Sequence, residues 1–138
     1  MTDTQHERQQ ASQPTPIVTK DDAVAGAQAA LDKKALDVVL LEVAPVVTYA
    51  DYILICSGRS TVQVNAIAAE IEAQMKLRKI RPLHIEGLTE ARWILMDYDE
   101  LIIHIFVEDA RSFYNLERLW GDVPRTVFES PTASALTI

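Results

Sequence analysis

The chain contains 138 residues, 49% of them hydrophobic, and has a formal net charge of −7 at pH 7. This length fits one domain with its own core, because single domains commonly contain about 100–150 residues. The acidic balance argues against a free nucleic-acid-binding protein, which would carry a basic patch, and favours a basic partner such as a ribosomal protein. The single cysteine, Cys56, excludes a disulfide framework and a cysteine-based metal cluster.

Both ends of the chain are predicted to lie outside the folded domain. Residues 1–20 are polar and contain two prolines, and residues 124–138 combine prolines with small polar residues, so neither stretch can bury enough surface to order itself. We therefore expect a disordered tail at 1–20, a folded domain at 21–123 and a flexible tail at 124–138. The first tail lacks the apolar segment of a signal peptide, and no apolar run approaches about 20 residues, so the sequence predicts a cytosolic protein without a membrane span.

The folded domain is predicted to combine helices and strands. A helix at 21–34 begins with two acids and ends with two lysines, which matches the helix dipole, and the apolar, β-branched runs at 36–43 and 51–56 are typical of strands covered on both faces. A longer helix at about 60–79 comes next, followed by strands at 83–87, 92–98 and 100–108 and by a helical stretch at 109–120 that ends at Gly121. This order predicts an α/β fold, in which helices flank a mixed sheet and the helix at 60–79 crosses over it.

The turn before the helix at 60–79 has the sequence "SGRS", and three kinds of enzyme site begin with a similar turn. A P-loop is excluded because Gly58 is not followed by the required Gly-Lys-Ser/Thr, and a nucleophile elbow because Val62 stands where its second glycine belongs. A nucleotidyltransferase needs acids that converge on a metal. Glu70 and Glu72 are two residues apart on a helix, so their carboxylates point to nearly opposite sides.

A structural role explains the same turn. Ser60 and Gln63 have the spacing of a capping box, in which each side chain bonds to the other residue's backbone N–H. Gly58 is expected to supply the backbone freedom for a sharp turn. We therefore favour a helix cap over a phosphate site, and an enzyme that binds a nucleotide at 57–60 remains the alternative hypothesis.

The segment "RWILMDYDELIIHIF" predicts a hairpin with two different faces. If Tyr98 and Asp99 form its two-residue turn, Asp97 pairs with Glu100 and Trp93 lies opposite His104. One face is then purely aliphatic and belongs to the core: Ile94, Met96, Leu101, Ile103, Ile105 and Val107. The other face mixes large aromatic side chains with histidine and acids: Trp93, Leu95, Asp97, Glu100, Ile102, His104 and Phe106.

Two interpretations of the mixed face stay open. An aromatic centre with a polar rim is typical of a protein interface. Alternatively, the final helix covers this face, and the space beneath is filled by Tyr114, Leu119 and Trp120. A metal site formed by His84, Glu86 and His104 is not favoured, because such loose sets are more often hydrogen-bonded surface residues, so we expect no metal and no other cofactor.

Four segments together resemble the ribosomal silencing factor S family, the Iojap-like proteins: "ADYILICSGRSTVQVNAIA", "IEG", "RWILMDYDELIIHIF" and "FYNLERLWGD". The resemblance runs from about residue 21 to Pro124. It implies a mixed sheet flanked by helices, related to nucleotidyltransferases but without their catalytic acids, and a binding protein rather than an enzyme. Members of this family bind the fourteenth protein of the large ribosomal subunit, block joining of the small subunit and lower translation when nutrients are scarce. Several members also form homodimers.

The resemblance also implies which residues contact the partner. The implied contact surface consists of Trp93, Asp97, Tyr98, His104 and Phe106, with Glu86, Arg92 and Tyr114 at its edge. Two other hypotheses remain: a divergent nucleotidyltransferase that uses residues 57–60, and a structural dimer whose aromatic face is buried against a second copy. Neither DNA nor a membrane is an expected partner.

Overall fold

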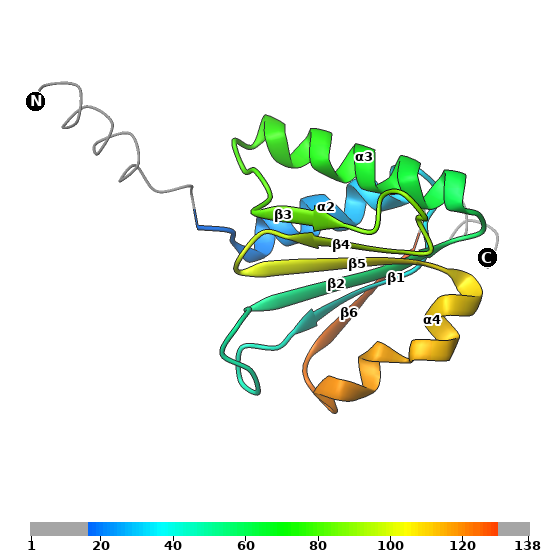
Figure 1. Ribbon diagram of the computed structural model, residues 1–138. Coiled ribbons are helices and arrows are strands. Elements are labelled where there is room, and N and C mark those ends of the chain that lie inside the picture. The colour runs from blue at the N-terminus through cyan, green and yellow to red at the C-terminus, as the bar shows by residue number, and fades with distance from the viewer. Residues whose placement is uncertain (1–16, 130–138) are drawn as a thin grey trace, which may run out of the picture.

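The structure, a computed structural model, describes residues 17–129 as a six-stranded mixed sheet flanked by helices (Figure 1). The predicted fold class is confirmed. In chain order the elements are α2 (Lys20–Asp32), β1 (Leu36–Glu42), β2 (Tyr52–Gly58), α3 (Thr61–Leu77), β3 (His84–Glu86), β4 (Trp93–Asp97), β5 (Leu101–Val107), α4 (Glu108–Tyr114), the 3-10 helix η1 (Leu116–Trp120) and β6 (Arg125–Phe128). No helix within 17–129 has the length and apolar content needed to cross a membrane.

The strands are arranged in the order β3-β4-β5-β2-β1-β6. The central strands β2 and β5 are parallel, and every other neighbouring pair in this sheet is antiparallel. The helix α3 leaves the end of β2, crosses β5 and β4, and delivers the chain to β3 at the sheet edge, as the predicted crossover requires (Figure 1). Both α2 and α3 lie on one face of the sheet (Figure 1).

The core lies between the sheet and these two helices. The aliphatic face predicted for the hairpin is buried there, and Ile94, Met96, Ile103 and Ile105 are completely inaccessible. Apolar residues spaced three and four apart put one stripe of α3 against these strands. The buried members of that stripe are Val64, Ile67, Ala68, Ile71 and Met75.

The hairpin turn differs from the prediction by one position. The N–H of Tyr98 donates to the carbonyl of Leu101 at 2.8 Å, so the two turn residues are Asp99 and Glu100 rather than Tyr98 and Asp99. Asp99 adopts a left-handed backbone with φ of 72°, which aspartate tolerates better than most residues. Trp93 therefore pairs with Phe106 instead of His104. Because the register moves by two residues, the paired residues keep their predicted faces. Glu100, predicted on the mixed face, instead lies in the turn, and its carboxylate accepts from the N–H of Val18 at 2.8 Å.

The ordered domain extends beyond both predicted boundaries. Residues 125–128, which we expected in a flexible tail, form β6 and pair antiparallel with β1. At the other end, Val18 is buried and the side chain of Thr19 caps α2, although both precede the predicted start at residue 21. The remaining tail residues, 1–16 and 130–138, lie outside the described range.

The turn at 57–60 is a helix cap, but two of its details differ from the prediction. The Ser60 hydroxyl accepts from the N–H of Gln63 at 3.1 Å, while the Gln63 side chain accepts from Arg59 rather than from Ser60. Gly58 does not adopt a left-handed backbone. It is needed for space, since a Cβ atom there would lie 3.0 Å from a methyl carbon of Val64. The turn thus packs α3 tightly against the end of β2.

The final helical stretch is divided in two. Predicted as one helix at 109–120, it is interrupted by Asn115, whose left-handed backbone (φ 46°, ψ 49°) ends α4 at Tyr114. The chain continues as η1, which ends at Gly121 as expected.

We expect Ile103→Ala to lower the free energy of unfolding by roughly 2–5 kcal/mol, because it leaves a cavity in the centre of the core. Leu77→Ala on α3 is the matched control, since that side chain is 76% exposed and its removal should change stability by less than about 0.5 kcal/mol. Urea unfolding followed by circular dichroism measures both. Equal effects of the two substitutions would contradict the assignment of the buried face.

Candidate protein interface

The sheet face opposite α2 and α3 is only partly covered. The short helix α4 packs on β5 and β2 at one end of this face, and no described helix lies over β3 and β4 (Figure 1). We call the uncovered part the open face. The strand register assigns it six side chains: His84 and Glu86 from β3, Trp93, Leu95 and Asp97 from β4, and Ile102 from β5.

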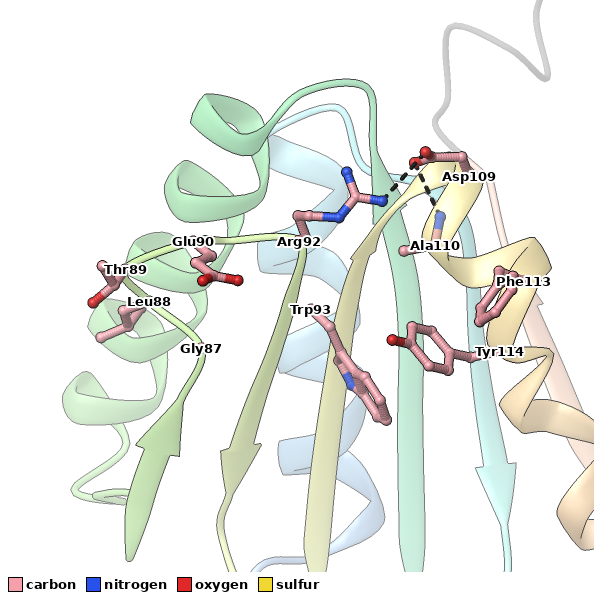
Figure 2. Close-up of a pocket in the computed structure, with 10 residues that line it drawn as sticks. All are labelled: Gly87, Leu88, Thr89, Glu90, Arg92, Trp93, Asp109, Ala110, Phe113 and Tyr114. Carbon is pink, nitrogen blue, oxygen red and sulfur yellow. Dashed lines mark hydrogen bonds and ion pairs between the residues drawn. The ribbon is translucent and has the colours of Figure 1, made fainter.

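An aromatic cluster stands where α4 meets the open face. The ring of Trp93 lies 5.0 Å from that of Phe106 and 4.8 Å from that of Tyr114, measured between ring centroids. Phe106 is completely buried, whereas Tyr114 is 52% exposed. Figure 2 shows Tyr114 reaching from α4 toward Trp93. Aromatic packing of this kind adds to the energy of area burial and fixes the ring positions.

The helix-covered interpretation of the mixed face is partly right, and the interface interpretation stays a prediction. Tyr114 does cover some of the mixed face, as the helix-covered interpretation expects. Leu119, however, is 71% exposed, and Trp120 is buried elsewhere, donating its indole N–H to the Tyr49 hydroxyl at 2.9 Å. The final helix covers one end of the face and leaves β3 and β4 accessible.

A hydrogen bond fixes the orientation of Trp93. Its indole N–H donates to Nδ1 of His104 at 3.0 Å. Nδ1 must then be an unprotonated acceptor, so the neutral imidazole carries its proton on Nε2. His104 is only 6% exposed, and this burial lowers its pKa to about 4. At neutral pH the imidazole is an uncharged support for the indole ring.

The predicted contact residues fall into three groups. Glu86, Arg92 and Tyr114 are exposed, and Trp93 and Asp97 are partly accessible. His104 and Phe106 are buried in this structure, so they support Trp93 from below and present little surface of their own.

Tyr98 lies on the wrong side of the sheet for the role that we predicted. As the last residue before the turn it points toward the core face, where it is 3% exposed. Burial raises the pKa of its hydroxyl, and the nearby Glu72 carboxylate on α3 raises it further. The hydroxyl is buried and lacks a hydrogen-bond partner among the described residues. Residue spacing placed Tyr98 within the turn, and the actual turn begins one residue later.

Acids hold the exposed His84, and Trp93 holds the buried His104. Nε2 of His84 lies 3.8 Å from Oε1 of Glu86, and Nδ1 of His84 lies 3.7 Å from Oδ2 of Asp97. His104 is turned away from this pair and bonds to Trp93. Within residues 17–129, no group of three or more His, Cys, Asp or Glu side chains is positioned to hold a metal ion.

Sequence analysis missed a groove beside the aromatic cluster. It lies between the β3–β4 loop and α4 and has a volume of about 910 Å³ (Figure 2). Trp93 forms its floor, Leu88 and Glu90 come from the loop, and Phe113 and Tyr114 come from α4. The adjacent aromatic residues Phe113 and Tyr114 are the feature of the sequence that could have indicated this groove. Two adjacent aromatic side chains on a short helix cannot both face the core, so at least one must be exposed.

The whole described fold falls within one family match. The model of the family described as "RsfS: Ribosomal silencing factor during starvation" matches residues 16–137. The chain belongs to the RsfS family. The match includes the hairpin that carries Trp93 and also β6, which sequence analysis had excluded.

Individual relatives agree with the family match. The chain is 47% identical to a ribosomal silencing factor RsfS of Bacillus subtilis over 93 residues, which are 67% of this chain and 79% of that protein. A crystal structure of a Bacillus halodurans protein superposes with a TM-score of 0.69 at 36% identity, covering 78% of this chain and 98% of that one. A mouse protein named "Mitochondrial assembly of ribosomal large subunit protein 1" is 32% identical over 64% of this chain and 40% of its own length.

The names of the family and of its relatives describe silencing factors, which is a regulatory role. The residues that an enzyme hypothesis would use have structural partners. Ser57 is buried and its hydroxyl accepts from Arg111 at 3.0 Å, and Glu70 accepts from Gln74 at 2.8 Å. The turn at 57–60 is thus engaged in holding α3 and α4 onto the sheet.

The buried neutral imidazole predicts a dependence of stability on pH. Between pH 6.5 and 4 the unfolded chain binds a proton at His104 that the folded chain does not, so the free energy of unfolding should fall as pH falls through this window. The total loss should be on the order of 3 kcal/mol. His104→Asn keeps an acceptor near Nδ1 but does not titrate, so urea unfolding at several pH values should show a flatter profile. Parallel profiles of the two proteins from pH 6.5 to 4 would contradict this account.

Proposed function

We propose that this protein is a ribosomal silencing factor that acts in the cytoplasm. It binds the large ribosomal subunit through the fourteenth ribosomal protein, blocks joining of the small subunit by occupying its docking face, and lowers translation when nutrients are scarce. Membership of the RsfS family and the names of its relatives support this proposal. The observation that carries it is the Trp93 cluster, an aromatic anchor fixed at the border of an open sheet face.

The composition of the open face suits a protein partner. Protein interfaces combine an aromatic centre with a polar rim, and most of their binding energy comes from a few anchors such as Trp and Tyr. Trp93 and Tyr114 form such a centre, with Leu95 beside them on β4. A tryptophan held by three ring contacts and a hydrogen bond loses little conformational freedom on binding, which favours affinity.

The charge around the open face suits a basic partner. Glu86 and Asp97 lie on the face, and Glu90 is exposed in the adjoining loop. Proteins that bind ribosomal RNA are commonly basic, and complementary charge raises the rate of encounter with such a partner. The net charge of −7 acts in the same direction.

Steric exclusion requires no catalytic group. A protein that occupies the docking face of one subunit prevents joining for as long as it stays bound, so its effect depends on affinity and concentration. A second copy of the chain docking on the same face would compete with the subunit. Sedimentation velocity at several concentrations distinguishes such a dimer from a monomer.

We expect the purified protein to co-sediment with isolated large subunits and to inhibit their joining to small subunits. Trp93→Ala should weaken binding by on the order of 2 kcal/mol, roughly 30-fold, because it removes the anchor. The substitution also removes the donor to buried His104, so some loss of stability is expected and only the folded fraction should be scored.

Ile103→Ala is the control for this experiment. It should destabilise the fold, yet the protein that remains folded should bind large subunits as well as the unmodified chain does. Normal binding by folded Trp93→Ala protein would remove Trp93 from the interface. Failure of the unmodified protein to bind large subunits would refute the proposed function.

A further inference from the structure

The loop wall of the groove has a fixed backbone. Gly87 has φ of 91°, and a Cβ atom there would collide with the carbonyl oxygen of Trp93. Ala91 is buried with φ of 56°, and its N–H donates to the Gly87 carbonyl at 2.8 Å. A left-handed backbone at a residue other than glycine costs energy and persists only where its surroundings fix it. The loop at 87–92 is therefore shaped before any ligand arrives.

The helical wall is anchored as well. Arg111 of α4 donates from Nε to Glu117 at 2.9 Å and from Nη1 to the buried hydroxyl of Ser57 at 3.0 Å. The bond to Ser57 holds α4 against the end of β2, and the bond to Glu117 ties α4 to η1. With both walls fixed, a groove of about 910 Å³ falls within the size range of ligand-binding sites in proteins, about 300–1,000 Å³.

The groove offers aromatic rings to solvent. Phe113 is 81% exposed and stands edge-on to Tyr114, with their ring centroids 5.1 Å apart. Trp93 forms the floor between the two walls (Figure 2). The faces of such rings carry negative potential and attract a cation placed within about 6 Å.

The groove also carries an excess of negative charge. Two lining residues, Glu90 and Asp109, are acids, and one, Arg92, is a base. Arg92 reaches toward α4 and pairs with Asp109 at 3.3 Å, while Glu90 lines the groove from the loop side (Figure 2). Glu90 takes part in none of the ion pairs formed among residues 17–129.

We propose that this groove takes an arginine side chain of the protein partner, laid against Trp93 and Tyr114 and paired with Glu90. The planar guanidinium stacks on aromatic rings, is weakly hydrated and bonds a carboxylate through two N–H groups, so it suits this combination better than an ammonium does. The inference rests on the proposed function, because it specifies the partner chemistry at the end of the same surface.

The first test uses binding to isolated large ribosomal subunits. Glu90→Gln removes the charge and Phe113→Ala removes an aromatic wall, and each should weaken binding about threefold to tenfold. Glu90→Gln should also reduce the loss of affinity on raising salt. The matched controls lie on α3, which faces away from the groove: Glu72→Gln and Leu77→Ala are exposed there and should bind like the unmodified chain.

The second test needs no ribosome. N-acetyl-arginine amide, added at millimolar concentrations, should cause a saturable shift of the Trp93 indole N–H resonance in nitrogen-15 NMR spectra. N-acetyl-citrulline amide has nearly the same shape without the charge and should cause little shift. The response to arginine should disappear in Glu90→Gln. An equal response to the two probes, or none to either, would overturn the assignment of the groove.

The two tests separate the groove from the function. If large subunits bind the unmodified chain and both groove variants equally well, while Trp93→Ala binds weakly, the arginine site is wrong and the silencing function stands. If the arginine probe binds as described but large subunits do not, the groove is a cation site and the proposed function fails.

Discussion

The parallel pairing of β2 with β5 at the centre of the sheet determines the path of the chain through α3 and through the strands β3 and β4. Parallel neighbours cannot be joined by a tight turn, so the chain must cross over the sheet between them. The helix α3 makes this crossover on the same face as α2, and together they bury the aliphatic side of the strands. The chain then returns inward from the edge through β3, β4 and β5 by antiparallel pairing, which places β5 beside β2 at the centre of the sheet.

This arrangement leaves the opposite face incomplete. The helix α4 packs on β5 and β2 and ends at Tyr114, and the chain then continues through η1 to β6 at the edge opposite β3. Tyr114, the last residue of α4, is the one that contacts Trp93. The cluster therefore marks the boundary between a covered and an uncovered part of one sheet. Its lower members, Phe106 and His104, belong to the core, and its upper members, Trp93 and Tyr114, reach solvent.

Periodicity predicted the faces of the hairpin but not its turn. Alternation assigns side chains to two sides, and a register error of two residues preserves that assignment, so the buried and open faces were predictable from 92–108. The position of the turn could not be predicted, because Tyr98, Asp99 and Glu100 lack the Asn-Gly or Asp-Gly signal that fixes a turn. Tyr98 was misplaced for that reason. The strand β6 was missed because four residues between Pro124 and Glu129 carry too short a pattern, and pairing with β1 supplies the order that they lack alone.

The groove was beyond the reach of local patterns. Its walls come from residues 87–92 and 109–114, which are brought together only by the pairing of β4 with β5. Its shape depends on Ala91, where a left-handed backbone is imposed by tertiary contacts and not by residue type. Glycine at 87 was a visible turn signal, but nothing in the sequence related it to Phe113. Long-range packing therefore determines the shape of this groove, which residue spacing in the sequence does not predict.

The open face and the groove meet at Trp93, and this junction bears on how steric silencing would work. A flat face such as that around Leu95 and Ile102 can bury area, but it restrains a partner weakly along the strand direction. A side chain of the partner that lies between two fixed walls restrains the position of the partner, because sliding along the face would force that side chain out of the groove. Blocking a docking surface demands a defined position as well as affinity. Under the proposed function, the face around Trp93 supplies contact area, and the groove beside it holds the protein where it obstructs the second subunit.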